Sequence, residues 1–118
     1  MDERRETKRT LASVFIRFDV DDGKEQITGF TQDISTEGIC VLSREELNLF
    51  ESLNMNIDIP NNPDIMQAEG NVRWVSKNAV FDDAGRKTYP VGIAFTYIDR
   101  QDREYLQEFI RIKEEVLK

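Results

Sequence analysis

The sequence contains no histidine and only one cysteine among its 118 residues. The lack of histidine removes the usual general base, the serine–histidine and cysteine–histidine nucleophile systems, and nearly every transition-metal site. The single cysteine, Cys40, cannot form an internal disulfide, so we expect a reduced core thiol in a cytoplasmic protein. We therefore expect no catalytic residues, no metal ligands and no cofactor.

Long apolar runs are absent as well. No segment approaches the roughly 20 apolar residues of a membrane span, and the N-terminus has no signal-peptide core. The length is that of one domain, and a hydrophobic fraction of 39% is enough for a modest core. With 16 basic and 23 acidic residues the net charge is -7. This charge disfavours DNA or RNA as a partner, because its field repels a polyanion.

The charge is distributed unevenly along the chain. Residues 1–10 carry four basic and three acidic side chains, whereas the other 108 residues carry 12 basic and 20 acidic ones. The first ten residues include no apolar residue except Met1, so they cannot bury surface to offset the entropy of ordering. We expect a flexible basic arm over residues 1–10, followed by one domain over residues 11–118.

Six segments of the domain have the pattern of short strands. Apolar residues alternate with polar ones in most of them, a period typical of half-buried β-strands. In the segment 66–76 every second residue from Met66 to Trp74 shares one face, and in the last segment every second residue from Tyr89 to Tyr97 does. The six segments are residues 14–20, 25–33, 39–42, 55–59, 66–76 and 89–97. Short strands with mostly short connections favour a small antiparallel barrel.

Two helices are predicted beside the strands. Ser43 and Glu46 have capping-box spacing, which predicts a short internal helix of about two turns through Leu47 and Phe50. Asp99 is placed to cap a C-terminal helix, whose main stripe recurs at a spacing of 3.6 residues and includes Leu106, Phe109, Ile110, Lys113 and Leu117. The fold class is therefore mainly β: a six-stranded antiparallel β-barrel with a short internal helix and a C-terminal α-helix.

Two short motifs could carry function. The first is the basic run from Arg4 to Arg9, and the second is the turn Asp33-Ile34-Ser35-Thr36-Glu37-Gly38. Each is weak alone. A basic hexamer is often only a solvated tail, and an Asp-x-Ser turn often bonds only its own backbone.

Together the two motifs resemble the signature of the PilZ domain family. That signature combines Arg-x-x-x-Arg ahead of a small barrel with Asp/Asn-x-Ser-x-x-Gly after its second strand. Here the first motif runs from Arg5 to Arg9, and the second from Asp33 to Gly38. The segments 69–74 and 91–95 are similar to later strands of the family, so the resemblance covers nearly the whole chain.

The resemblance implies binding of cyclic di-GMP, a bacterial second messenger, by Arg5, Arg9, Asp33, Ser35 and Gly38. A guanidinium can fork onto a guanine edge or a phosphate, and a carboxylate accepts hydrogen bonds from guanine N–H groups. Arg4 and Trp74 are second-rank candidates. The alternative for Trp74 is a partly buried strand aromatic with no ligand contact.

The function expected from this resemblance is a cyclic di-GMP sensor that orders its arm over the ligand and signals to a downstream effector protein. One alternative is a PilZ-type protein–protein interaction module that does not bind nucleotide. A second is a small phosphoester hydrolase, which would need a metal cluster or base that this histidine-free sequence does not provide. The pathway, the partner, the oligomeric state and the number of ligand molecules stay open.

Overall fold

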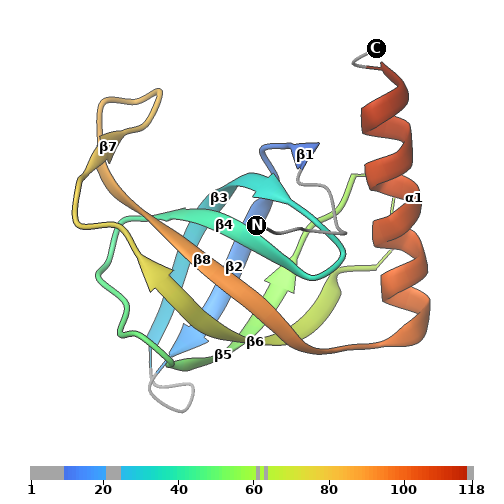
Figure 1. Cartoon of the computed structure of the whole chain (residues 1–118), viewed down its shortest axis with the longest axis horizontal. Coiled ribbons are helices and arrows are strands. Elements are labelled where there is room, and N and C mark those ends of the chain that lie inside the picture. Colours follow the sequence, from blue (N-terminus) through green and yellow to red (C-terminus); the bar gives the residue numbers. More distant parts are fainter. Residues whose placement is uncertain (1–9, 21–24, 61, 63, 117–118) are drawn as a thin grey trace, which may run out of the picture.

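The computed structural model describes residues 10–20, 25–60, 62 and 64–116. Within these residues the chain forms eight strands followed by one helix (Figure 1). The elements are β1 (Thr10–Leu11), β2 (Phe15–Val20), β3 (Glu25–Ile34), β4 (Gly38–Ser43), β5 (Ser52–Ile57), β6 (Met66–Val75), β7 (Val80–Phe81), β8 (Lys87–Ile98) and α1 (Arg100–Val116).

Six of the strands close into an antiparallel barrel. The strand order is β3-β2-β5-β6-β8-β4, and β4 pairs again with β3 to close the ring. The two short strands lie outside this ring: among the described residues β1 pairs with β3 alone and β7 with β8 alone. The predicted mainly β barrel with a C-terminal helix is confirmed, and its six predicted strands correspond to the six strands of the ring.

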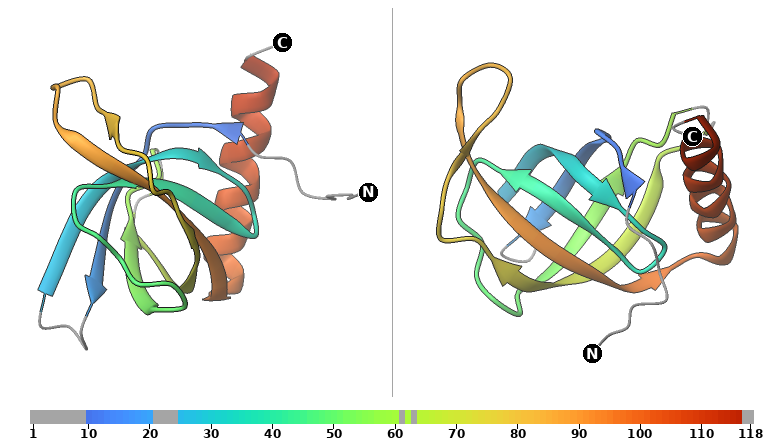
Figure 2. Two further views of the ribbon diagram at one scale, coloured as in Figure 1. Left: turned by 60° about the vertical axis from the view of Figure 1, so that its left-hand side comes forward. Right: turned by 45° about the horizontal axis from the view of Figure 1, so that its top comes forward.

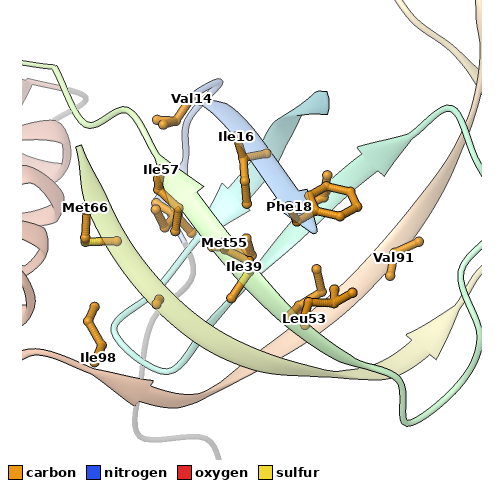
Figure 3. Close-up of a cluster of buried hydrophobic side chains, with 14 of the residues drawn as sticks. Val14, Ile16, Phe18, Ile39, Leu53, Met55, Ile57, Met66, Val91 and Ile98 are labelled. Carbon is orange, nitrogen blue, oxygen red and sulfur yellow. The ribbon is translucent and has the colours of Figure 1, made fainter. Parts of the chain in front are cut away.

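The barrel interior is filled by the inward-facing residue of each alternating pair. Along β2, Ile16, Phe18 and Val20 are buried while Phe15 and Arg17 are exposed. Figure 3 shows side chains from β2, β4, β5, β6 and β8 meeting in one buried apolar cluster. This period-2 burial is what a strand with one face on the core requires.

Helix α1 stands beside the barrel (Figure 2). Asp99 caps it as predicted, because its Oδ2 accepts a hydrogen bond from the Gln101 N–H at 3.1 Å. Leu106 and Ile110 belong to the same buried cluster as Met66 and Ile98, so the helix packs on the barrel through its apolar stripe. In the described part of the chain no helix is both long and apolar enough to span a membrane.

The predicted internal helix is wrong. Residues 44–51 form an irregular connection between β4 and β5. The Ser43 hydroxyl does not reach residue 46: it accepts a hydrogen bond from the Glu45 N–H at 3.2 Å and donates to the Glu45 carbonyl at 2.6 Å. Phe50 has a φ of 68°, and its N–H donates to the Val72 carbonyl. The chain therefore turns into the sheet at the point where a helix would have continued.

Two β-bulges between β6 and β8 show that the predicted alternation is wrong at the ends of two series, Met66 to Trp74 and Tyr89 to Tyr97. One shift lies between Val72 and Trp74, and the other lies between Glu69 and Gly70. A bulge inserts one residue and reverses the side to which the following residues point. Trp74 is consequently exposed instead of sharing the buried face of Val72, and Tyr97 is exposed while Ile98 is buried.

Candidate functional site

The turn between β3 and β4 is organised by the hydroxyl of Ser35. Ser35 is buried, and its Oγ accepts hydrogen bonds from the N–H groups of Glu37 and Gly38, each at 3.2 Å, while donating to the Gly38 carbonyl. The Ser35 N–H also donates to the Gly38 carbonyl at 2.9 Å. The hydroxyl is thus committed within the turn, so Ser35 fixes the shape of this loop.

The far end of the turn is held against β8 and α1. A Cβ added to Gly38 would overlap the carbonyl oxygen of Ile93, so only glycine permits this close approach of the two strands. The N–H of Phe95 donates to the Glu37 carbonyl at 2.8 Å, and Nη1 of Arg103 donates to the Thr36 carbonyl at 3.0 Å. Helix α1 therefore supports the turn from behind through one guanidinium.

The start of the described chain lies beside this turn. In β1, Thr10 pairs with Ile34 and Leu11 pairs with Asp33. The Thr10 hydroxyl also donates to Oε2 of Glu114 in α1 at 3.3 Å. The residue that follows the Arg5–Arg9 motif in the sequence is therefore anchored directly against the strand that carries Asp33.

A buried threonine fixes the path from β1 to β2. The hydroxyl of Thr31 accepts a hydrogen bond from the Val14 N–H at 2.9 Å and donates to the Ala12 carbonyl at 2.6 Å. The Thr31 N–H donates to the Val14 carbonyl at 2.9 Å. These three bonds hold residues 12–14 on β3 next to the β3–β4 bulge between Thr31 and Asp33.

The strand register aligns several candidate residues on the outer surface of the barrel. Asp33 pairs with Cys40, Cys40 pairs with Gly92, and Gly92 pairs with Trp74. We call these four residues the Asp33–Trp74 row. Directly paired residues share one face, and neighbouring strands lie about 4.8 Å apart, so the row spans about 14 Å. Its two ends are the predicted ligand residue Asp33 and the second-rank candidate Trp74.

Trp74 rests on the glycine in the middle of this row. A Cβ at Gly92 would overlap the Nε1, Cε2 and Cδ1 atoms of the indole, so the ring lies directly over that backbone. The side chain remains 44% exposed. Arg73 is the exposed residue at the bulge between Val72 and Trp74. This end of the row therefore presents an accessible aromatic ring.

Cys40 is buried, as predicted, but it does not point into the core. Its neighbours Ile39 and Val41 face the core cluster, so Cys40 faces the outer side of β4 within the row. Its thiol donates to Oε1 of Gln32 at 3.5 Å. Cys40 and Gly92 are the two small residues of the row between Asp33 and Trp74, and both are buried.

The structure brings Asp33, Gly38 and Trp74 to one side of the barrel, with Ser35 inside the adjoining turn. The predicted residues Arg4, Arg5 and Arg9 lie outside the described residues. Sequence reasoning missed Arg103, Gly92 and Arg73. No local sequence pattern predicts the role of Arg103. A glycine in the middle of a strand, such as Gly92, does indicate that another group packs closely against the backbone.

Comparison with known proteins gives one family. A family model described as the PilZ domain matches residues 3–111. No curated protein matches the chain.

Solved structures share the fold at low sequence identity. The inhibitor of motility MotI/DgrA of Bacillus subtilis is 24% identical with a TM-score of 0.71 over 97% of this chain, which spans 53% of that one. The PilZ domain of YcgR from Escherichia coli, in a structure with c-di-GMP, is 17% identical with a TM-score of 0.73, over 98% of this chain and 95% of that one. MrkH of K. pneumonia, in a c-di-GMP complex, is 15% identical with a TM-score of 0.75, over 99% and 57%.

Proposed function

Because the chain belongs to the PilZ domain family, we propose that it binds cyclic di-GMP between its N-terminal Arg5–Arg9 motif and the turn from Asp33 to Gly38. This family is one of ligand-binding, regulatory modules whose solved members include complexes with c-di-GMP. The observation that carries the proposal is the pairing of Thr10 with Ile34. It joins the two halves of the signature, since Arg9 is the residue directly before Thr10.

The chemistry of the ligand suits the residues proposed. Cyclic di-GMP carries two phosphate charges and two guanines, and the arm offers Arg5 and Arg9, with Arg4 as a third donor. A guanidinium can bond a phosphate or the guanine O6/N7 edge through two parallel N–H groups. Asp33 accepts from guanine N–H groups, because an ionised carboxylate is an acceptor only.

Ser35 and Gly38 act through the shape of the turn in this proposal. The Ser35 hydroxyl accepts hydrogen bonds from the N–H groups of Glu37 and Gly38. It therefore holds the loop in the shape that meets the ligand, and it does not itself bond the ligand. Trp74 is the wall at the other end of the Asp33–Trp74 row. Its indole covers Gly92 and remains 44% exposed, so a planar base can pack against the exposed surface of the ring.

Binding closes the arm over the ligand in this proposal, and the arm, ligand and barrel then form a new surface that a downstream effector protein recognises. Ordering of each arm residue costs about 1–2 kcal/mol in backbone entropy. Each good bidentate contact returns about 1–3 kcal/mol, and micromolar affinity requires about 8 kcal/mol in total. We therefore expect moderate affinity, which suits a signal that must be released.

Calorimetric titration with cyclic di-GMP tests the proposal. We expect saturable heat with the intact chain and a loss of about 5- to 150-fold in affinity for Arg9→Ala, equivalent to about 1–3 kcal/mol. Asp33→Asn should weaken binding as well. Arg17→Ala is the matched control, because Arg17 is an exposed arginine on β2 with no place in the proposed site.

Silence in the intact chain would favour the alternative of a PilZ-type interaction module that does not bind nucleotide. That the chain has no catalysis of its own stays a prediction, and conversion of cyclic di-GMP to a linear product during the titration would contradict it. The expectation that it does not bind DNA or RNA also stays a prediction, since MrkH is described as a transcription regulatory factor.

A further inference from the structure

An aromatic strip crosses the outer surface of the barrel next to the Asp33–Trp74 row. Phe15 of β2 pairs with Phe30 of β3, and Phe30 pairs with Leu42 of β4. The two rings meet edge to face with centroids 5.5 Å apart, yet they remain 40% and 47% exposed. Two adjacent aromatic side chains on the solvent side of a sheet are typical of an interaction surface.

The strip forms one side of a groove, and the hairpin of β7 and β8 forms the other. The hairpin extends away from the barrel on the side opposite to α1 (Figure 1). The groove has a volume of about 180 Å³, and its lining includes Phe15, Phe30, Leu42, Arg44, Asp82 and Arg86. Its size suits one apolar side chain with part of its flanking backbone.

The charges in this groove differ from those of the whole chain. Arg44 and Arg86 line it on a molecule whose net charge is -7. Arg86 already bonds Asp82, with Nε 2.9 Å from Oδ2. Within the described residues Arg44 has no ion pair or hydrogen bond through its side chain, so its guanidinium is available at the rim. An acidic partner is therefore favoured here, because a carboxylate beside the apolar strip would meet an unpaired cation.

We propose that this groove docks a segment of a partner protein that carries an aromatic or leucine side chain flanked by carboxylates. The apolar side chain packs against the edge of the Phe15–Phe30 pair, and a carboxylate pairs with Arg44. The idea that this groove is the output surface of a nucleotide sensor depends on the proposed function. Its preference for a segment that is both acidic and apolar does not depend on it.

The position of the groove supports a link to the ligand. Leu42 lies two residues from Cys40 along β4, and Pro90, which pairs with Leu42, lies two residues from Gly92 along β8. Residues two apart on a strand point to the same face, so the aromatic strip and the Asp33–Trp74 row are neighbouring rows of one outer surface. A partner protein bound to the aromatic strip would therefore lie next to a ligand bound along the Asp33–Trp74 row.

A phage-displayed library of random 12-residue peptides, panned on the full chain, tests this assignment. We expect enriched peptides to combine an aromatic residue or leucine with neighbouring Asp or Glu. The best of them, made synthetically, should bind at least tenfold more weakly to Arg44→Glu and to Phe30→Ser. The matched controls are Arg100→Glu, an exposed charge reversal on α1, and Tyr105→Ser, an exposed aromatic on α1; both should leave peptide binding unchanged.

Enriched peptides without acidic residues, or equal binding to Arg44→Glu, would overturn the proposal. So would a dimer of the chain that Arg44→Glu dissociates in sedimentation equilibrium, because the occupant would then be a second copy. Thermal melting excludes unfolding as the reason for a loss in Phe30→Ser. Panning with and without cyclic di-GMP distinguishes the docking proposal from the proposed function. Acidic peptides that are enriched in both conditions and depend on Arg44 support the docking proposal even if calorimetry finds no nucleotide binding.

Discussion

The absence of a side chain at Gly92 allows the indole of Trp74 to pack against the backbone of β8. The indole of Trp74 occupies the space that a Cβ at position 92 would take. Gly92→Ala should therefore push the ring away from the barrel surface and increase its contact with water. Trp74 is the only tryptophan in the chain, so intrinsic fluorescence reports on it alone.

We expect the emission of Gly92→Ala to shift to longer wavelength and, if the row holds the ligand, cyclic di-GMP affinity to fall. Ala94→Gly, a change of equal size two residues along the same strand, serves as the control. An unchanged emission maximum in Gly92→Ala would contradict the contact. Fluorescence that does not respond to cyclic di-GMP, in a sample where calorimetry detects binding, would remove Trp74 from the site.

Thr31 is the buried polar side chain that holds the root of the arm on the barrel. Its hydroxyl accepts a hydrogen bond from the Val14 N–H and donates one to the Ala12 carbonyl. Both backbone groups are buried with their residues, so water cannot replace the hydroxyl. Thr31→Val keeps the shape but leaves both backbone groups unpaired, so we expect a loss of about 1–3 kcal/mol in the free energy of unfolding.

Urea denaturation measures this effect. Thr28→Val is the control, because Thr28 is exposed on the same strand and its change should stay within about 0.5 kcal/mol. A Thr31→Val protein as stable as the unmodified chain would show that the three bonds between β3 and residues 12–14 contribute little.

Asp82 makes the hairpin of β7 and β8 sensitive to acid. Oδ1 of Asp82 accepts hydrogen bonds from the N–H groups of Ala84 and Arg86, at 3.0 and 2.8 Å. The backbone bond from Arg86 is the largest cause that holds the pKa of Asp82 below its ordinary value, and the Arg86 guanidinium adds to it. Gly85, with a φ of 79°, completes the turn.

A carboxylate with a lowered pKa stabilises the folded hairpin above the pKa of the unfolded chain, about 3.9 for Asp, and this contribution is lost as pH falls through the lower folded pKa. We expect the amide signals of Ala84 and Arg86 to be constant in NMR spectra from pH 7 to about pH 4 and to move below that value. Asp82→Asn should abolish the movement. A midpoint at or above the ordinary value of an aspartate would contradict the assigned bonds.

Most strands could be predicted from the sequence because alternating burial is a property of each segment alone. Ile16, Phe18 and Val20 already specify which face of β2 is buried. The bulges could not be predicted, because an inserted residue such as Arg73 or Thr96 is recognised only against its partner strand. The same holds for residues 43–50, where capping-box spacing was overridden by the pairing of Phe50 with Val72. The strands β1 and β7 are too short for any periodicity.

The candidate site was predictable in composition and not in geometry. Asp33 and Gly38 are predicted from the turn motif, and Trp74 is a second-rank candidate from the family resemblance. The sequence separates Asp33 from Trp74 by 41 positions, and only the register of four strands brings them into one row. The bond from Arg103 to Thr36 depends on how α1 packs on the barrel, which no local pattern specifies.

On the scale of the whole molecule, the barrel provides a rigid surface and the N-terminal arm provides the charge. The closed ring leaves no free edge among the six barrel strands, so the surface that carries the row is fixed before any ligand arrives. The body of the chain is acidic, whereas the arm is basic. A doubly charged nucleotide is therefore expected to need the arm, and variants that neutralise the arm should lose binding without losing the fold.

Hydrogen exchange of the full chain with and without saturating cyclic di-GMP tests the central claim most directly. We expect protection to rise together in residues 4–10 and in residues 33–38, while exchange in α1 stays unchanged. Unaltered exchange in both segments at saturating ligand would contradict the claim that the arm closes over the nucleotide on this turn.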